Sequence, residues 1–152
     1  GFASNGLHTN GYSLARKVLL EKFSVNDKTE MLQGTLGEEL LKVHKSYLGL
    51  IKELKEKISI HAFSHITGGG IVGNTKRVVP KDLQLKIDWN SWDVPSIFRL
   101  IQNTGNITDE EMRVVFNMGI GLIAIVDKND VDTVMKISEA FDEKGIIAGE
   151  VI

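Results

Sequence analysis

One almost wholly apolar run, 120–126 (Ile-Gly-Leu-Ile-Ala-Ile-Val), constrains the fold of this chain more than any other feature. A strand without polar side chains on either face has to be covered on both faces, as in the centre of a sheet packed by helices. A chain of 152 residues is long enough for that, because it can bury roughly 68–70% of the surface that its unfolded form exposes. We therefore expect a single domain over residues 1–152.

Charge and composition exclude several classes of protein. Lys and Arg number 18, Asp and Glu number 20, and the formal net charge is −2, with the basic residues spread along the chain. This pattern argues against nucleic acid or an acidic membrane as a partner. No apolar run approaches the ~18 residues of a membrane span, and the absence of cysteine excludes disulfides and thiolate metal sites. We expect a cytoplasmic location.

The first residues suggest a piece of a longer polypeptide. The chain opens on Gly1-Phe2-Ala3-Ser4, with no initiator Met, no basic stretch and no apolar segment of a signal peptide. We expect a fragment, or a product cut from a longer chain.

The spacing of apolar residues predicts the order of elements. Spacings of three and four predict helices over 10–22, 47–58, 95–105, 108–116 and 131–141. Asn10 is the expected N-cap of the first, and Thr108 with Glu111 forms a capping-box sequence. A further helical segment is expected over 70–79, and strands over 58–66, 83–87, 120–126 and 146–152.

The stretch 23–45 has no clear period, so we expect a loop anchored by Leu36, Leu40 and Leu41. Helices and strands alternate without a strict βαβ rhythm. The fold class is therefore α/β or α+β, with a mixed β-sheet packed by helices.

The first loop, Ser4-Asn5-Gly6-Leu7-His8-Thr9-Asn10-Gly11, is a candidate ligand site. It places a hydroxyl, two amides and an imidazole before a helix start, whose N–H groups favour phosphate or carboxylate. The alternative is that Ser, Asn and Gly are cap and turn residues. His8 is not explained by that alternative, since a histidine near its usual pKa of about 6.5 exchanges protons at neutral pH.

A second candidate is Thr67 with the triple glycine Gly68, Gly69 and Gly70. Successive glycines let the backbone approach a ligand and expose N–H groups to it. The alternative is a tight strand-to-helix connection, but three glycines cost more backbone entropy than such a turn needs. The segment matches neither the dinucleotide fingerprint nor the Walker sequence, because the spacing and the Lys are missing.

Other polar and aromatic residues have plainer interpretations. His61 and His65 share a strand face but stand about 13 Å apart along a regular strand, so one ion cannot bind both. We expect packing and hydrogen bonding for His61, and packing for Trp89 and Trp92. In the segment 116–121 only Asn117 has a ligand-directed option. No metal site is predicted.

Taken together, four ordered motifs resemble one family. They are Ser4-x-Gly6-x-His8-x-Asn10-Gly11-Tyr12-Ser13-Leu14-x-Arg16-Lys17, Leu36-Gly37-Glu38-Glu39-Leu40-Leu41, His65-Ile66-Thr67-Gly68-Gly69-Gly70 and Phe116-Asn117-Met118-Gly119-Ile120-Gly121. The series resembles the C-terminal half of the phosphoribosylformylglycinamidine cyclo-ligases, also called AIR synthetases, over essentially the whole chain.

The resemblance implies an activity and a partner domain. Family members use ATP to phosphorylate the formyl amide oxygen of formylglycinamidine ribonucleotide; an internal nitrogen attacks, phosphate leaves, and aminoimidazole ribonucleotide forms in purine synthesis. An N-terminal domain, not part of this chain, supplies most ATP and Mg²⁺ ligands and the contact of a homodimer. The isolated C-terminal half is expected to be inactive.

The resemblance also implies roles for individual residues. His8 would be the acid/base or phosphate-contacting residue; Ser4, Asn10, Gly11 and Asn117 would bind substrate; Thr67, Gly68, Gly69 and Gly70 would bind phosphate. The chain departs from the family at 42–45, where a Pro-Thr pair is usual, and at 73–76, after which Arg77 matches again.

Two other functions stay open at this point. One is a related ATP-dependent enzyme, such as a selenophosphate synthetase, a thiamine-monophosphate kinase or a hydrogenase maturation factor. These enzymes carry other sequences at the triple glycine, so that motif argues against them. The other is a non-catalytic module that binds phosphate.

Overall fold

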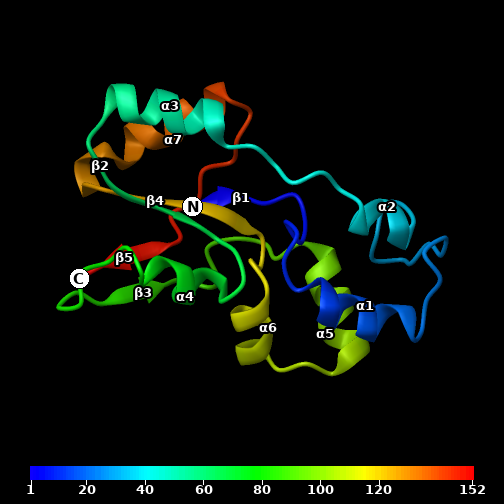
Figure 1. The fold of residues 1–152 in the computed structure, drawn as a ribbon. Coiled ribbons are helices and arrows are strands. Elements are labelled where there is room, and N and C mark those ends of the chain that lie inside the picture. Colours follow the sequence, from blue (N-terminus) through cyan, green and yellow to red (C-terminus); the bar gives the residue numbers. More distant parts are fainter.

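The computed structural model describes all residues from 1 to 152, and the chain passes back and forth between the two ends of an elongated molecule (Figure 1). In chain order they are β1 (Phe2–Ala3), α1 (Tyr12–Leu20), α2 (Leu36–Leu40), α3 (Leu48–Lys57), β2 (Ile60–His65), α4 (Gly70–Thr75), β3 (Leu85–Ile87), α5 (Ser96–Gly105), α6 (Asp109–Val115), β4 (Ile120–Val126), the 3-10 helix η1 (Lys128–Asp130), α7 (Val131–Ala140) and β5 (Gly149–Val151).

Strand β4 is central, as its apolar sequence predicts. It lies between β1 and β2 and is antiparallel to both, so that Leu122 faces Phe2 on one side and His65 on the other. Strands β3 and β5 form a second, two-stranded antiparallel sheet. The predicted fold class of helices packed on sheet is confirmed. The pairing differs from one mixed sheet because the helix after β4 leads to a separate sheet instead of to a parallel neighbour.

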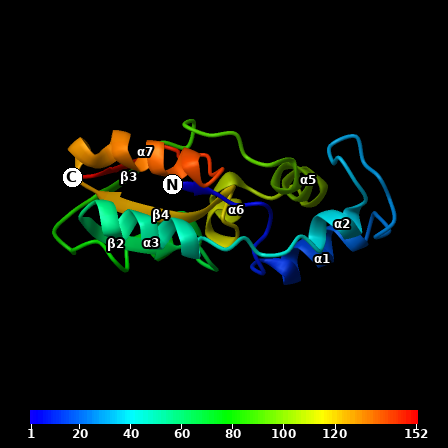
Figure 2. The same ribbon diagram turned by 90° about the horizontal axis from the view of Figure 1, so that it is seen from above.

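Both faces of β4 are buried. On one face Leu122 packs with Leu54 and Val134 beneath α3 and α7, which lie side by side over the sheet (Figures 1 and 2). On the other face Ile120 and Ile123 pack in a cluster with Ile66, Ile71, Trp92, Ile146 and Ala148. The apolar run therefore occupies the two-sided environment that it predicts.

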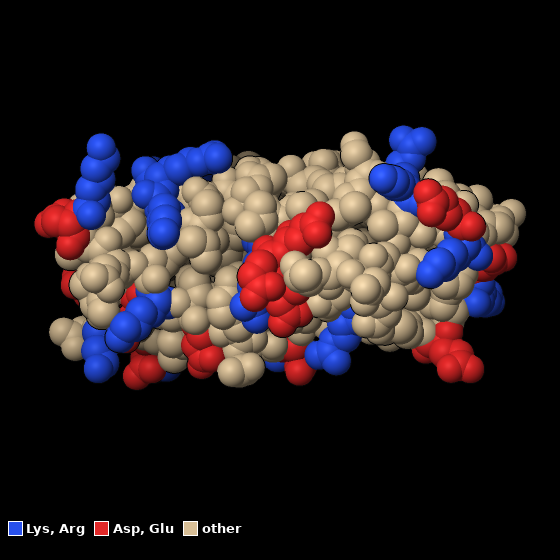
Figure 3. Space-filling view, turned by 90° about the horizontal axis from the view of Figure 1, so that it is seen from below, with Lys and Arg blue, Asp and Glu red and all other residues tan.

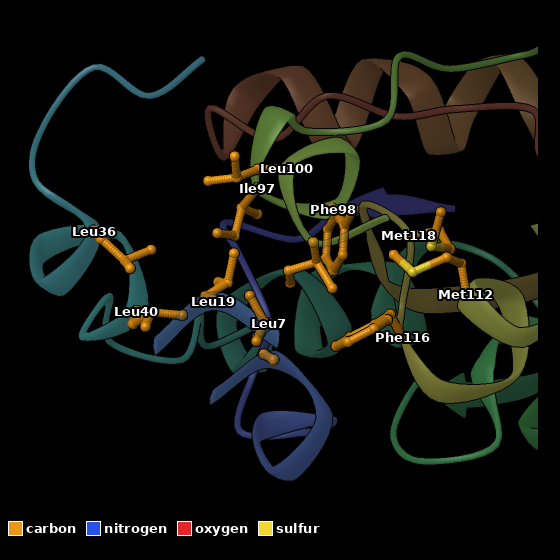
Figure 4. Packing of buried hydrophobic residues seen from close by; sticks show 12 residues of the cluster. Leu7, Leu19, Leu36, Leu40, Ile97, Phe98, Leu100, Met112, Phe116 and Met118 are labelled. Atoms are coloured by element: carbon orange, nitrogen blue, oxygen red, sulfur yellow. The ribbon is translucent and has the colours of Figure 1, made fainter. Parts of the chain in front are cut away.

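A third cluster holds the helices α1, α2, α5 and α6 together beside the sheet (Figures 2 and 4). Its buried members are Leu7, Ala15, Leu19, Leu36, Leu40, Ile97, Phe98, Leu100, Ile101, Met112, Phe116 and Met118. Leu7 belongs to the first loop, so its burial in this cluster anchors that loop to the helices.

The segment 23–45 is not entirely loop. Thr35 caps α2 in a reciprocal capping box: its hydroxyl accepts from the Glu38 N–H at 3.2 Å, and its own N–H donates to the Glu38 carboxylate at 2.8 Å. The expectation that Leu41 is an anchor is wrong, because this side chain is 82% exposed. Leu36 and Leu40 are buried as expected.

Two predicted helix ends also shift. The N-cap of α1 is Gly11, with a left-handed φ of 72°, and not Asn10, whose side chain bonds elsewhere. Helix α4 ends at Thr75 and not near 79. Thr108 does cap α6, since its hydroxyl accepts from the Glu111 N–H at 3.2 Å.

The surface carries both signs of charge. Figure 3 shows acidic and basic side chains interspersed over one long face of the molecule. Such a mixed face offers no single-sign field for a polyanion. None of the helices combines the length and the apolar character that crossing a membrane requires.

Candidate functional site

The first loop is held by buried hydrogen bonds to the segment that precedes β4. The Ser4 hydroxyl donates to Asn117 Oδ1 at 2.8 Å, and the Asn117 amide donates to the Gly6 carbonyl at 2.8 Å. The same Oδ1 accepts from the Gly119 N–H at 2.8 Å. Asn117 is only 1% exposed, so its side chain is committed to partners within the protein.

His8 lies in the interior of this loop and is only 3% exposed. Its Nε2 is 2.6 Å from Asn5 Oδ1, and the Asn5 amide is oriented by donating to the Val43 carbonyl at 2.9 Å. An oxygen so close indicates that Nε2 carries the proton and donates it. The Asn5 backbone N–H, 3.2 Å from the same nitrogen, is then no donor to it.

The other imidazole nitrogen of His8, Nδ1, is buried without a hydrogen-bond partner. It lies against Gly121, where a Cβ would come within 2.8 Å of it and within 2.2 Å of the Tyr47 hydroxyl oxygen. Only glycine leaves room for both rings here. Burial first, and then the neighbouring His44, His65 and Lys45, lowers the pKa of His8 to about 4. The ring is therefore neutral at pH 7.

The backbone of the loop is strained beside this ring. His8 and Thr9 have φ angles of 52° and 63°, in the left-handed region that a β-branched residue such as Thr rarely adopts. The Asn10 amide donates to the His8 carbonyl at 2.7 Å and so holds this conformation. Residues kept in such conformations cluster at ligand sites.

Two further histidines, His44 and His65, adjoin His8. The His44 ring stacks on that of His8 with centroids 4.1 Å apart and planes at 20°. The His65 ring is 5.4 Å from that of His44. Sequence reasoning missed His44, which lies in the predicted loop 23–45, and no local pattern indicates that it meets a strand residue.

The glycine loop is organised by Asn74, a second residue that the sequence did not single out. Its amide donates to the Gly70 carbonyl at 2.8 Å and to the Thr67 carbonyl at 3.1 Å, and its Oδ1 accepts from the Thr67 hydroxyl at 3.0 Å. Arg77, which is exposed, reaches the same Oδ1 at 3.4 Å. A guanidinium thus lies beside the triple glycine.

The three glycines differ in what they permit. A Cβ on Gly70 would lie 1.8 Å from the Arg113 carbonyl oxygen, so this position allows close packing of the loop against α6. A Cβ on Gly68 would meet nothing nearer than Asn10 Oδ1 at 3.9 Å. The space above Gly68 is therefore open.

Asn10 connects the first loop with the glycine loop. Its Oδ1 accepts from the Gly68 N–H at 3.1 Å, in an exposed position. The structure thus brings His8, Asn10, Thr67 and Gly68 to one place. Ser4 and Asn117 lie on the buried side of the first loop, and Gly11 packs against the Phe116 ring, where a Cβ would be 2.3 Å away.

Two grooves of the molecule lie away from these loops. One of about 510 Å³ lies between α1 and α2 and is lined by residues such as Tyr12, Leu20 and Leu41. A smaller one, of about 120 Å³, lies beside Trp89 and Arg113. Neither is lined by a predicted site residue.

His61 and the two tryptophans stand apart from the candidate site. His61 is exposed, with Nε2 3.4 Å from an Asp127 carboxylate oxygen, so its expected packing role is wrong. Trp92 is buried and donates to the Met118 carbonyl at 2.9 Å, and Trp89 packs against Arg113. Both tryptophans pack as expected.

Comparison with known proteins identifies the class of domain. The family model described as "AIR synthase related protein, C-terminal domain" matches residues 1–152. The chain belongs to this family.

Curated relatives narrow the resemblance. The chain is 46% identical to the phosphoribosylformylglycinamidine cyclo-ligase of Thermoanaerobacter sp. (strain X514), 42% to that of Pseudothermotoga lettingae and 44% to that of Bacillus cytotoxicus. Each alignment covers 100% of this chain and 44–46% of the relative. The chain therefore spans somewhat less than half the length of the relatives it matches.

Proposed function

We propose that this chain is the substrate-side half of an ATP-dependent cyclo-ligase that converts formylglycinamidine ribonucleotide to aminoimidazole ribonucleotide in purine synthesis. The convergence of the first loop and the glycine loop through Asn10 carries the proposal, because two distant motifs then face one ligand. The names of the relatives, at 42–46% identity, support the reaction. They also weigh against a related kinase or selenophosphate synthetase.

The remaining parts of the enzyme come from the rest of the polypeptide. We place most of the ATP and Mg²⁺ ligands and the homodimer contact in an N-terminal half, and the complete enzyme in the cytoplasm. ATP supplies the phosphoryl group that activates the formyl amide oxygen. The chain itself then has to hold the substrate and handle the charge and protons of ring closure.

The glycine loop is the part of this chain that fits a phosphate-bearing group. The Gly68 N–H is exposed and bonds only a side chain, Asn10 Oδ1, which a phosphate oxygen can replace. The Gly69 and Gly70 N–H groups are committed to the Val114 and Thr67 carbonyls, at 3.0 and 3.1 Å. Arg77 beside the loop adds a positive charge suited to a phosphate oxygen.

His8 is the proposed proton-handling residue. The neutral imidazole keeps an unpartnered lone pair on Nδ1, which is the atom that would accept a proton as the ring closes. It is covered by His44 in this conformation, and contact with substrate requires that the stacked ring moves aside. Ser4 and Asn117, which the resemblance assigns to substrate, act in this proposal by holding the loop in place.

The test is a turnover measurement on the complete polypeptide. His8→Ala is expected to lower kcat by roughly a hundredfold or more, as for loss of a general acid or base. His61→Ala, an exposed histidine elsewhere on β2, is the matched control and is expected to leave kcat unchanged. Equal turnover of the His8 variant and the wild type would refute the catalytic role.

A second measurement separates catalysis from simple binding. The isolated chain is expected not to close the ring, because the half that we propose binds ATP is not part of it. Ring closure by the isolated chain would contradict this division of labour. A complete polypeptide that binds phosphate compounds but never cyclises the substrate would instead support a non-catalytic module.

A further inference from the structure

The Nε2 atoms of His44 and His65 face each other at 3.4 Å, although the two residues come from different parts of the chain. His44 lies in the segment before α3, and His65 is the last residue of β2. A well-formed hydrogen bond from an N–H donor is usually shorter, about 2.7–3.2 Å. A different arrangement accounts better for this spacing.

We propose that His44 and His65 form a two-histidine site for a divalent transition metal of the zinc class. Two imidazole nitrogens bound tetrahedrally to Zn²⁺ at about 2.0–2.1 Å lie about 3.4 Å apart, with ring centroids about 5.3 Å apart. The observed separations are 3.4 Å and 5.4 Å. The rings are therefore already placed for one ion between them.

The neighbours of His44 favour the tautomer that a metal needs. The Thr9 hydroxyl donates its proton to the His8 carbonyl at 2.6 Å, so only its lone pairs face His44 Nδ1, 3.5 Å away. This contact is too long for a well-formed hydrogen bond, but oxygen lone pairs there favour a proton on Nδ1 over a second lone pair, which leaves the lone pair of the ring on Nε2. Metal-bound histidines are commonly oriented by such an acceptor behind the ring.

The backbone that carries each of the two histidines is anchored by hydrogen bonds, and both side chains reach the surface. The Val43 carbonyl accepts from Asn5, and the Tyr47 hydroxyl donates to the Ala3 carbonyl at 2.8 Å, so one flank of His44 is tied to the first loop and the other to β1. His65 is paired with Leu122 in the sheet.

The site is open. No group of three or more His, Asp or Glu side chains is arranged to hold a metal anywhere in the chain, so water or an anion completes the coordination. Such a site binds more weakly than a closed four-ligand site. Imidazole ligands favour Zn²⁺, Ni²⁺, Cu²⁺ and Co²⁺ over Mg²⁺.

Titration of the protein with Co²⁺, followed by visible absorption, tests the site, and calorimetry with Zn²⁺ gives its affinity. We expect one ion per chain, with the spectrum of a Co²⁺ bound by imidazole. His44→Ala and His65→Ala are each expected to weaken binding at least tenfold, whereas His61→Ala, the matched control on β2, is expected to leave it unchanged.

Three outcomes would overturn the site. They are no binding by the wild type, binding by His44→Ala and His65→Ala as tight as that of the wild type, or loss of binding in His61→Ala alone. His65 is exposed, so His65→Ala is expected to fold normally, and circular dichroism checks that its fold is intact. The metal titration does not measure ring closure. Absence of metal binding therefore leaves the proposed cyclo-ligase role untouched, and absence of ring closure leaves the metal site untouched.

Discussion

The first loop and the glycine loop both contain glycine and lie side by side, but their groups face different ways. In the first loop two polar side chains turn inward: Ser4 and His8 are buried, and Asn117 bonds to Ser4 and to the Gly6 carbonyl. In the glycine loop the chain itself is anchored by Asn74, while Gly68 and Arg77 are exposed. Glycine and asparagine residues near a site can therefore either hold the shape of the backbone or contact a ligand.

Because of this difference, substitutions are expected to have effects of two kinds, on stability and on ligand binding. Changes to inward-facing groups remove buried hydrogen bonds or create clashes, so they act on the free energy of unfolding. Changes to outward-facing groups leave water to replace the lost partner, so they act on ligand binding. The following predictions test that division, beginning with the greatest change in stability.

Gly70→Ala is expected to have the largest effect. The added Cβ would lie 1.8 Å from the Arg113 carbonyl oxygen, and φ is 64°, so the loop or α6 has to move. We expect a loss of about 4 kcal/mol or more in the free energy of unfolding, measured by urea denaturation.

Gly68→Ala is the matched control for this change. Its Cβ would meet only Asn10 Oδ1, at 3.9 Å, so the expected loss is at most about 1 kcal/mol. Equal stabilities of the two variants would show that the glycine loop is not anchored at Gly70.

Asn117→Ala is expected to follow, with a loss of about 3 kcal/mol. It leaves the buried Gly6 carbonyl and Gly119 N–H without their partner and removes the acceptor of the Ser4 hydroxyl. Ser4→Ala removes only one of these bonds, and its expected cost in the same urea experiment is about 1 kcal/mol. A smaller loss for Asn117→Ala than for Ser4→Ala would contradict the inward-facing arrangement.

The buried His8 predicts a loss of stability in acid. Its pKa is lowered to about 4 in the folded protein, whereas a histidine in an unfolded chain titrates near 6.5. Between these values the unfolded chain binds a proton that the folded chain does not, so the stability present above pH 6.5 falls as the pH falls. The expected loss from pH 7 to pH 5 is roughly 2 kcal/mol.

Urea denaturation at several pH values, in buffer with a chelator, measures this slope. His8→Gln lacks this titrating group and is expected to make the curve shallower between pH 7 and pH 5, while the lowered pKa values of His44 and of the buried Gly1 amino group keep some slope. A wild-type curve as flat as that of the variant would mean that His8 is free to take up a proton in the folded state.

Much of the fold follows from local sequence patterns. The apolar run of β4, the stripe of α3 and the cap at Thr108 each act within a few residues, and each element forms where its pattern predicts. Helix α2 was missed although Thr35 and Glu38 have capping-box spacing, because only five residues follow the cap. Antiparallel pairing was missed because strand direction depends on contacts between distant segments.

The candidate site could be predicted only in part, for the same reason. His8, Asn10 and the triple glycine were found because unusual residues lie close together in sequence. Asn74 was missed, since an asparagine inside a short helix has no local signature of the three carbonyls that it contacts. His44 and His65 are 21 positions apart in the sequence, and their meeting has no signature at all.

Asn10→Ala is expected to have the smallest effect on stability, although this residue joins the two loops. It removes the acceptor of the Gly68 N–H, which water can replace at an exposed position, and the donor to the His8 carbonyl. We expect a loss of at most about 1 kcal/mol in urea denaturation. Asn10→Asp is the comparison, because its carboxylate keeps the acceptor for Gly68 but sets an oxygen against the His8 carbonyl in place of the donor. A loss for Asn10→Ala as large as that for Asn117→Ala would mean that the glycine loop depends on this bond for its shape, and the distinction between an inward-facing and an outward-facing loop would then not hold.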